Sequence, residues 1–316
     1  MISRVYLLYR TTTSLVVLVG VSCLTFALTF LTPGDPAETI LRQQYGQTPP
    51  PDVVDAFREN HGLDEPFVVQ YLDWLSNILR GDFGTSYYSD REVISLLAEA
   101  LPPTVELAVA AMVVALVIAV PAGVLSAVHQ GAWIDNLCQF SALAGISMPN
   151  FWLGYLLIIV FSLKLSLFPV AGSGGISYLV LPAITLGTGM SAIIMRLVRM
   201  SLLEVLEEPY VDMARSKGLN ERIVIYKHAL RNALIPVVTI VGLQFGFMLN
   251  GAVVVEIVFQ RPGLGMLLVD AIFVRDYPVV QGAVLVISVL FVVTNALVDF
   301  SYQYLDPRIQ LGRGRS

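Results

Sequence analysis

Residues 104–128 read TVELAVAAMVVALVIAVPAGVLSAV and contain a single charged residue, Glu106. A helix needs about 20 predominantly apolar residues to cross the hydrocarbon layer of a bilayer. The stretch meets that length with only one charge, which lies near its beginning. It therefore predicts a transmembrane helix, and the rest of the chain can be compared with it.

Five further stretches have the same length and character, so we expect an all-α membrane protein with six transmembrane helices in a single domain. They are Thr12–Leu31, Leu137–Leu163, Tyr178–Val198, Ala233–Val258 and Val279–Tyr302. Arg4 and Arg10 before the first stretch could mark a signal peptide. The apolar region of a signal peptide covers only about 7–15 residues, so an uncleaved span is the better interpretation. Gly187 and Gly189 make the fourth stretch the least regular.

The composition is that of a membrane protein. Apolar residues make up 56% of the 316 residues and charged residues 14%, against roughly 25% charged in soluble domains. The net charge of −5 arises in one segment, because residues 32–101 alone carry −8. No basic face for nucleic acid is present. Cys23 and Cys138 lie in apolar stretches and are expected to pack as small apolar residues, without a metal site or disulfide framework.

The distribution of lysine and arginine predicts the orientation, because these residues concentrate on the cytoplasmic side. Twelve of them lie at the termini, in the connection after the fourth span and at the helix ends beside it, whereas three lie in the short connections of the other face. The C-terminal tail contributes Arg308, Arg313 and Arg315. We therefore expect both termini in the cytoplasm and the long segment 32–101 outside.

The acidic segment 32–101 has the apolar spacing of short helices. The pattern is visible in Val53, Val54 and Phe57 and again from Phe67 to Leu79. Prolines and glycines punctuate the segment between these runs. It predicts two or three short helices that cover the outer face.

The hydrophilic connection between the fourth and fifth spans predicts a helical hairpin. Pro209 is suited to begin a helix, with Glu207 and Glu208 beside its positive end. Gly218 suits the left-handed position that ends a helix, and Asn220 can cap a second helix through Arg231 that leads into the fifth span. A hairpin of this kind is exposed to a partner in the cytoplasm, although an ordinary connecting loop would have the same pattern.

These residues also carry a resemblance. The run Tyr210-Val-Asp-Met-Ala-Arg-Ser-Lys-Gly-Leu219, followed by His228, Leu230, Arg231, Asn232, Ala233 and Pro236, resembles the cytoplasmic EAA loop of ABC-importer permeases in its peptide and nickel branch. Further matching runs are Gly62-Leu-Asp-Glu-Pro66, Gly81-Asp-Phe-Gly84, Pro262-Gly-Leu-Gly265 and Arg275-Asp-Tyr-Pro278. Because all these runs occur together and in the same order, the chain is similar to the first permease subunit of dipeptide, oligopeptide, glutathione and nickel importers.

The resemblance implies a type I ABC-importer permease in the bacterial inner membrane, with 32–101 as extracytoplasmic loop and 201–231 as cytoplasmic coupling loop. It implies four kinds of partner: a second, homologous permease in a heterodimer, two ATPase subunits, an extracytoplasmic solute-binding protein and the membrane lipid. The chain contains no Gly-x-x-x-x-Gly-Lys-Ser/Thr run. We therefore expect it to be no enzyme and to bind no cofactor, with ATP and Mg on the ATPase subunits.

The resemblance assigns contact with the ATPase to the coupling loop. The residues are Tyr210, Asp212, Met213, Ala214, Arg215, Lys217, Gly218, Arg222, His228 and Arg231. The general E-A-A triplet falls on Asp212, Met213 and Ala214, a departure that is usual in the peptide branch. Gly218 is the strongest candidate, because a side chain would oppose a left-handed turn. A plain helix end, a topological role for the basic residues and a hydrogen-bonded His228 are the alternatives.

Polar residues inside the spans are candidates for the substrate pathway, with hydrogen bonding between helices as the alternative. They are Gln244, Asn250, Glu256 and Asn295. The run Gly242-x-x-x-Gly246 allows close helix approach, either to the partner permease or within the chain.

Peptides are the first choice of substrate, with nickel chelates and glutathione as alternatives because their permeases share these motifs. The alternative function is a self-sufficient secondary transporter or channel. That class usually has an inverted repeat or a charged site at the midplane, and we find neither in the sequence. An intramembrane enzyme would need a reactive set within the spans, whereas His61, His129 and His228 lie in connections or at span ends.

Overall fold

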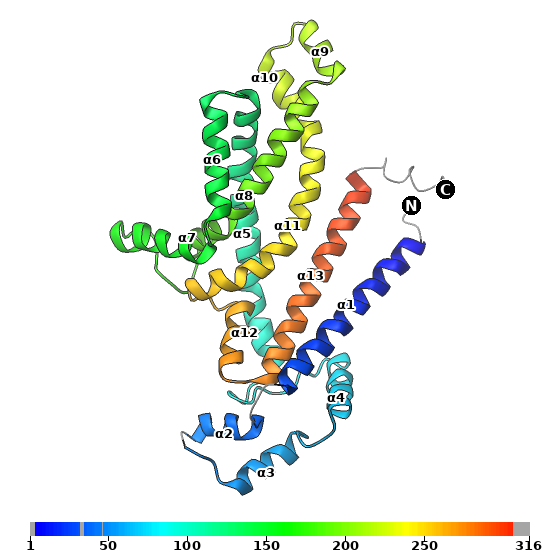
Figure 1. Cartoon of the computed structure of the whole chain (residues 1–316), viewed down its shortest axis with the longest axis vertical. Helices are drawn as coiled ribbons and strands as arrows, with labels where there is room; N and C mark the ends of the chain where they lie inside the picture. Colours follow the sequence, from blue (N-terminus) through cyan, green and yellow to red (C-terminus); the bar gives the residue numbers. More distant parts are fainter. Residues whose placement is uncertain (1–3, 32–34, 46, 306–316) are drawn as a thin grey trace. The chain divides into compact units, whose positions relative to one another are not determined.

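The computed structural model describes residues 4–31, 35–45 and 47–305. Within these ranges the chain is almost entirely helical (Figure 1), and its only extended pairing is one isolated antiparallel bridge between Thr85 and Glu92. The predicted all-α class is confirmed. The basic tail with Arg308, Arg313 and Arg315 lies outside the described residues.

Five long helices contain segments that are long and apolar enough to cross a membrane. They are α1 (Arg4–Phe30), α5 (Val93–Val128), α8 (Ile176–Leu206), α11 (Leu230–Val258) and α13 (Tyr277–Leu305). A bent pair of shorter helices can make a sixth span. The pair consists of α6 (Trp133–Ser147) and α7 (Asn150–Leu157), with α7 continued by the π-helical turns η1 (Ile158–Lys164).

The third predicted span is a bent pair of helices and not one straight helix. The axis turns by 105° between α6 and the segment that begins at Asn150. Pro149 causes the break, because a proline disfavours the helical conformation of the residue before it. Met148 accordingly has extended angles, φ −83° and ψ 125°. The fourth predicted span, in contrast, is the unbroken 31-residue helix α8.

The chain divides into two compact units. The first consists of the residues up to Thr104 together with Pro262–Val292, and the second of Val105–Arg261 together with the residues from Val293 on. In the second unit, α8 packs against α6, α7 and α11. Small residues on α5 and larger ones on α8 and α11 form its core.

Two glycines bring α5 and α8 into backbone contact. A Cβ atom on Gly187 of α8 would lie 2.6 Å from the carbonyl oxygen of Ala111 on α5, and one on Gly123 of α5 would lie 2.7 Å from Cβ of Val198 on α8. Neither distance leaves room for a methyl group. Gly242 of α11 lies equally close to the side chain of Val298, so its close approach serves packing within the chain.

The first unit contains the three short helices expected between the first two spans. They are α2 (Pro36–Tyr45), α3 (Pro51–Asn60) and α4 (Phe67–Leu79). An aromatic cluster joins α4 to α1: Phe26 of α1 meets Phe67, Tyr71 and Trp74 with ring centroids 5.4–5.9 Å apart. The hydroxyl groups of Ser22 and Tyr71 lie 2.9 Å apart in the same contact.

Polar contacts fasten the loop after α4 to the turn between α12 (Leu264–Phe273) and α13. The buried Ser86 hydroxyl donates to the Asp276 carboxylate at 2.5 Å, and the backbone N–H of Tyr87 donates to the same carboxylate at 3.1 Å. Burial and the nearby Asp276 charge raise the pKa of Tyr87 to about 12. This contact joins segments that lie 190 residues apart in the sequence.

Candidate functional site

The first helix of the coupling loop has the predicted ends. Helix α9 (Pro209–Ser216) begins with Pro209 in its first turn, where the missing N–H costs nothing. It ends before Gly218, which has φ +77° and donates its N–H to the carbonyl of Arg215 at 2.9 Å. That left-handed conformation costs an L-residue about 1–2 kcal/mol, so glycine is the residue that ends α9 without strain.

The second helix begins as predicted and leads into the fifth span, as expected. The Asn220 side chain accepts the N–H of Arg222 at 3.0 Å and caps the helix. From there α10 (Glu221–Ile223) and the π-helical turns η2 (Val224–Ala229) lead directly into α11. Arg231 is therefore the second residue of α11, and the coupling loop is joined to the fifth predicted span by continuous helix.

A small apolar core holds α9 against η2. Val211, Ala214 and Val224 are buried together, and Leu206 of α8 packs against them. Val211 and Ala214 face inward from α9, so the residues between them face outward. The Met213 side chain is accordingly 60% exposed. Ala214 therefore supports α9 from beneath, while Asp212, Met213 and Arg215 form its open surface.

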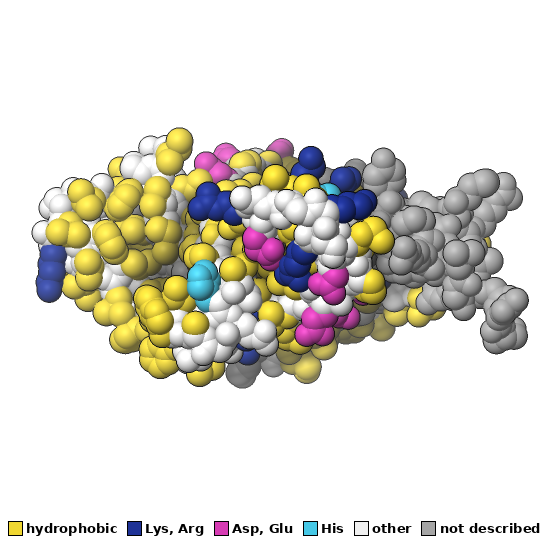
Figure 2. Space-filling model, turned by 90° about the horizontal axis from the view of Figure 1, so that it is seen from above, with side chains coloured by type: hydrophobic (Ala, Val, Ile, Leu, Met, Phe, Trp, Pro, Cys, Tyr) yellow, Lys and Arg dark blue, Asp and Glu magenta, His cyan; other side chains and the backbone are white. Residues whose placement is uncertain are grey.

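Three charges of the coupling loop are paired with one another. The guanidinium of Arg215 donates to the Glu221 carboxylate at 2.9 Å and to the Asp212 carboxylate at 3.3 Å. Both carboxylates raise the pKa of Arg215. Figure 2 looks onto this end of the chain and shows Lys and Arg side chains beside Asp and Glu side chains, bordered by hydrophobic ones.

A polar contact and a cavity connect the base of α9 with α11. The side-chain amide of Asn232 donates to the Tyr210 hydroxyl at 2.7 Å. Beside it lies a cavity of about 660 Å³ whose polar lining includes Lys227, His228 and Arg231. Lys217, Arg222 and Arg231 are exposed, and His228 is half-buried. The predicted coupling residues thus lie around one small hairpin and the cavity at its base.

The predicted pathway residues differ in their surroundings. Glu256 is fully buried and Gln244 is buried, whereas Asn295 is half-buried and Asn250 is exposed. Asn250 and Asn295 are therefore the more accessible of the four, and the pathway role of all four stays a prediction.

Sequence reasoning missed Asn150, which begins α7 at the bend. A Cβ atom on Gly189 of α8 would lie 3.8 Å from its amide oxygen, and one on Gly251 of α11 would lie 3.9 Å from its amide nitrogen. The side chain therefore lies between the glycines of two long helices. The Met148-Pro149 pair inside an apolar stretch was the signal that could have located this polar bend.

Sequence reasoning also missed a buried ion pair close to the beginning of the coupling loop. Asp135 of α6 is 1% exposed and accepts two hydrogen bonds from Arg199 of α8, each at 2.8 Å. Ser126, Gly131 and Gln139 donate to the same carboxylate at 2.5, 2.9 and 2.8 Å. The pair joins α6 to α8 seven residues before α8 ends at Leu206.

Comparison with known proteins identifies the family. Residues 119–311 match the family described as binding-protein-dependent transport system inner membrane component, and residues 2–108 match the N-terminal part of such membrane components. The glutathione transport system permease protein GsiC of Escherichia coli K12 is 43% identical over 92% of this chain and 94% of its own. The dipeptide transport system permease protein DppB of Alkalihalophilus pseudofirmus is 40% identical over 93% and 96%.

Solved structures support the fold. The methionine ABC transporter MetNI in an inward-facing conformation matches with a TM-score of 0.57 at 20% identity, over 67% of this chain and 97% of that one. An amino acid ABC transporter matches with a TM-score of 0.54 at 14% identity, over 67% and 94%. The chain therefore belongs to the family of binding-protein-dependent transport system inner membrane components and is a permease subunit of an ABC importer.

Proposed function

We propose that this permease imports small peptides, and that the coupling loop transmits the closure of two ATPase subunits to the transmembrane helices. The family membership argues against the alternative function, a self-sufficient transporter or channel. Peptides are favoured as substrate because the relatives include a dipeptide and a glutathione permease, and glutathione is itself a tripeptide. Nickel chelates are the remaining alternative.

One observation carries the proposal for coupling: α9 is held rigidly while its outer surface stays open. Its inward side chains Val211 and Ala214 are buried, and Met213 projects from the opposite face. An exposed, flexible methionine is suited to fill an irregular groove on a partner. A push on α9 would pass into α11, because η2 continues into that helix without a break.

The proposed arrangement follows from this role. The coupling loop lies in the cytoplasm with both termini, and the segment 32–101 lies outside, where it receives the solute-binding protein. A second, homologous permease completes the pathway, with Asn250 and Asn295 as its polar candidates in this chain. ATP and Mg bind to the two ATPase subunits, so this chain needs no cofactor of its own.

The decisive experiment compares two glycines with similar positive φ angles. Gly218 has φ +77° and Gly131, in the connection between α5 and α6, has φ +75°, and a Cβ atom at either position would meet no atom within 4 Å. Each is changed to Val in the complete importer, reconstituted with its partner permease, ATPase subunits and binding protein. We expect Gly218→Val to assemble but to lose stimulation of ATP hydrolysis by the binding protein, whereas Gly131→Val keeps it.

The outcomes separate the possibilities. If both variants keep full stimulation, the coupling role of Gly218 is wrong. If both lose it, general strain rather than coupling explains the effect. Uptake of a labelled dipeptide, of glutathione and of a nickel chelate into vesicles tests the substrate: uptake of the nickel chelate without uptake of the dipeptide would contradict the choice of peptides.

A further inference from the structure

A cavity of about 710 Å³ lies within the first unit, among the short helices of segment 32–101. The α3–α4 connection, one face of α4 and the loop after α4 form most of its wall, and the start of α13 completes it. Small-molecule sites typically have volumes of about 300–1,000 Å³. The cavity thus has room for a whole small solute and far exceeds the volume of one lysine side chain.

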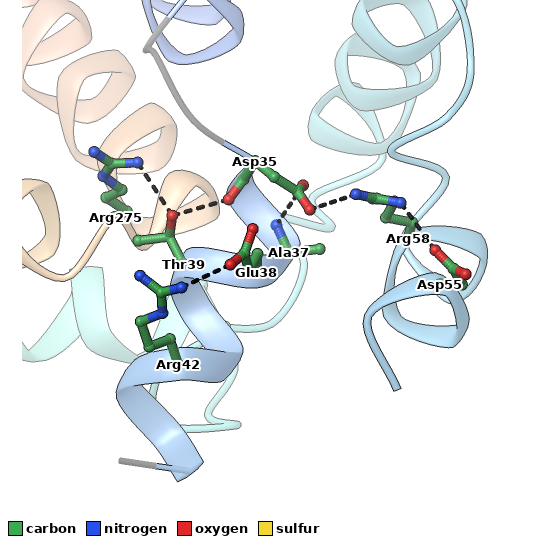
Figure 3. Close-up of polar contacts among 8 residues, drawn as sticks. All are labelled: Asp35, Ala37, Glu38, Thr39, Arg42, Asp55, Arg58 and Arg275. Carbon is green, nitrogen blue, oxygen red and sulfur yellow. Dashed lines mark hydrogen bonds and ion pairs between the residues drawn. The ribbon is translucent and has the colours of Figure 1, made fainter. Parts of the chain in front are cut away.

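The charge of this cavity is strongly negative. Five carboxylates line it, those of Asp35, Asp64, Glu65, Asp73 and Asp82, and the only lysine or arginine among the lining residues is Arg58. Arg58 is already engaged: it pairs with Asp35 at 2.6 Å and with Asp55 at 2.9 Å (Figure 3), and the Asp35 carboxylate raises its pKa.

The other four carboxylates therefore give the cavity its unbalanced charge. Asp64, Glu65, Asp73 and Asp82 take part in no ion pair within the described ranges of the chain. All four are exposed. A cation that enters the cavity would meet several negative charges and no competing base.

Aromatic rings form the second feature of the wall. Trp74 lines the cavity and stacks on Tyr71 with ring centroids 6.1 Å apart. Tyr87 lines it from another side and meets the rings of Phe57 and His61 at 5.7 and 4.9 Å. Aromatic faces attract organic cations, and stacked rings have little freedom to collapse into the space.

Contacts between distant segments fasten two of the lining residues. Figure 3 shows Arg275, just after α12, donating to the Thr39 hydroxyl of α2 at 3.2 Å, and that hydroxyl donating in turn to the backbone carbonyl of Asp35 at 2.9 Å. The Asp35 carboxylate accepts a hydrogen bond from Arg58 of α3. Asp35 and Arg58, which both line the cavity, are thereby joined to α2 and to Arg275 after α12.

We propose that this cavity binds a small organic solute through a protonated amine, such as the amino terminus of a dipeptide. The inference deepens the proposed function, on which it rests, by placing a site for the solute in this chain outside the membrane-spanning helices. The carboxylates attract the ammonium group, the aromatic rings cover its apolar neighbours, and the remaining volume holds the rest of the molecule. A basic loop of the binding protein is the alternative occupant.

Titration calorimetry on the complete importer, with the binding protein omitted, tests the site. The probes are alanyl-alanine and N-acetyl-alanyl-alanine, which differ in the ionised amine. We expect alanyl-alanine to bind and the acetylated peptide to bind at least about tenfold more weakly. The double variant Asp64→Asn/Asp73→Asn should weaken alanyl-alanine binding about tenfold, which corresponds to about 0.7 kcal/mol for each exposed carboxylate.

Two further variants test whether the effect is specific to the cavity. Glu59→Gln removes an exposed carboxylate of α3 that does not line the cavity and should leave binding unchanged. Trp74→Leu removes an aromatic wall without altering charge and should also weaken binding. Stimulation of ATP hydrolysis by the binding protein, measured on each preparation, shows that the variants still form a working importer.

Three results would overturn the proposal. They are the absence of alanyl-alanine binding to a working importer, equal binding of both peptides, and binding that none of the cavity variants changes. If the cavity variants weaken only the docking of the binding protein, its basic loop and not the solute occupies the cavity. Loss of stimulated ATP hydrolysis in the unaltered importer would instead count against the proposed function, so the two failures are distinguishable.

Discussion

Asp135 of α6 and Arg199 of α8 form a bidentate ion pair, with the Nε and Nη2 atoms of Arg199 each 2.8 Å from a different carboxylate oxygen. The pair is buried and lies near the end of the helix that leads into the coupling loop. Three more donors, from Ser126, Gly131 and Gln139, complete the shell of the carboxylate. The Asp135 carboxylate thus accepts five hydrogen bonds.

Removal of one partner of this pair should therefore destabilise the protein. Asp135→Ala leaves the Arg199 charge in a mostly buried site, and we expect a loss of about 3 kcal/mol. The double variant Asp135→Leu/Arg199→Met should recover most of the loss, because no charge is then left unpaired. Thermal unfolding of the purified importer measures both. If the double variant were less stable than the single one, the burial of an unpaired charge would be the wrong explanation.

Gly187→Ala tests the close contact of α5 and α8. The added methyl group would lie 2.6 Å from the carbonyl oxygen of Ala111, so a helix must shift, and we expect a loss of about 1–3 kcal/mol. Gly20→Ala is the matched control, because nothing lies within 4 Å of that position in α1 and alanine favours a helix. Equal midpoints of thermal unfolding for the two variants would contradict this account of the helix contact.

Tyr210→Phe tests the link between α9 and α11. The variant keeps the ring and removes only the hydroxyl that accepts a hydrogen bond from Asn232. A bond of this kind contributes about 1 kcal/mol, so stimulated ATP hydrolysis should fall by up to about fivefold while assembly is retained. Tyr226→Phe, at an exposed position of η2, is the control. An unchanged rate in Tyr210→Phe would show that the link is not needed for transmission.

The raised pKa of Tyr87 predicts a loss of stability of the folded protein at high pH. Its pKa is about 12 in the folded protein, against about 10 for an ordinary tyrosine. Between these values the unfolded chain has released the proton and the folded chain has kept it, so stability falls as pH rises from 10 to 12. The expected loss is on the order of 2–3 kcal/mol. Titration of tyrosine absorbance should show one late group that is missing in Tyr87→Phe; an identical titration would refute the assignment.

The features that sequence reasoning predicted are those set by local chemistry. The spans follow from apolar composition, and the ends of α9 follow from Pro209 and Gly218, whose backbone preferences act within a single turn. The functional roles of the coupling residues remain predictions, because they depend on partners. The bend after α6 was also local, but the length of its apolar stretch concealed the effect of Pro149.

The features that it missed depend on contacts between distant residues. Asp135 and Arg199 lie 64 residues apart, and Ser86 and Asp276 lie 190 apart. From the sequence alone, nothing around one carboxylate indicates which residue, 64 or 190 positions away, is its partner.

The two glycine contacts between α5 and α8 limit the motions that are open to these helices. They lie at Ala111 and Gly123 along α5, and at Gly187 and Val198 along α8. The spacing is roughly 17 Å on both helices, at 1.5 Å per residue. Two helices in close contact at two separated points can neither slide nor rotate against each other unless one of the contacts opens. We therefore expect the parts of α5 and α8 between these contacts to move together when the permease changes conformation during transport.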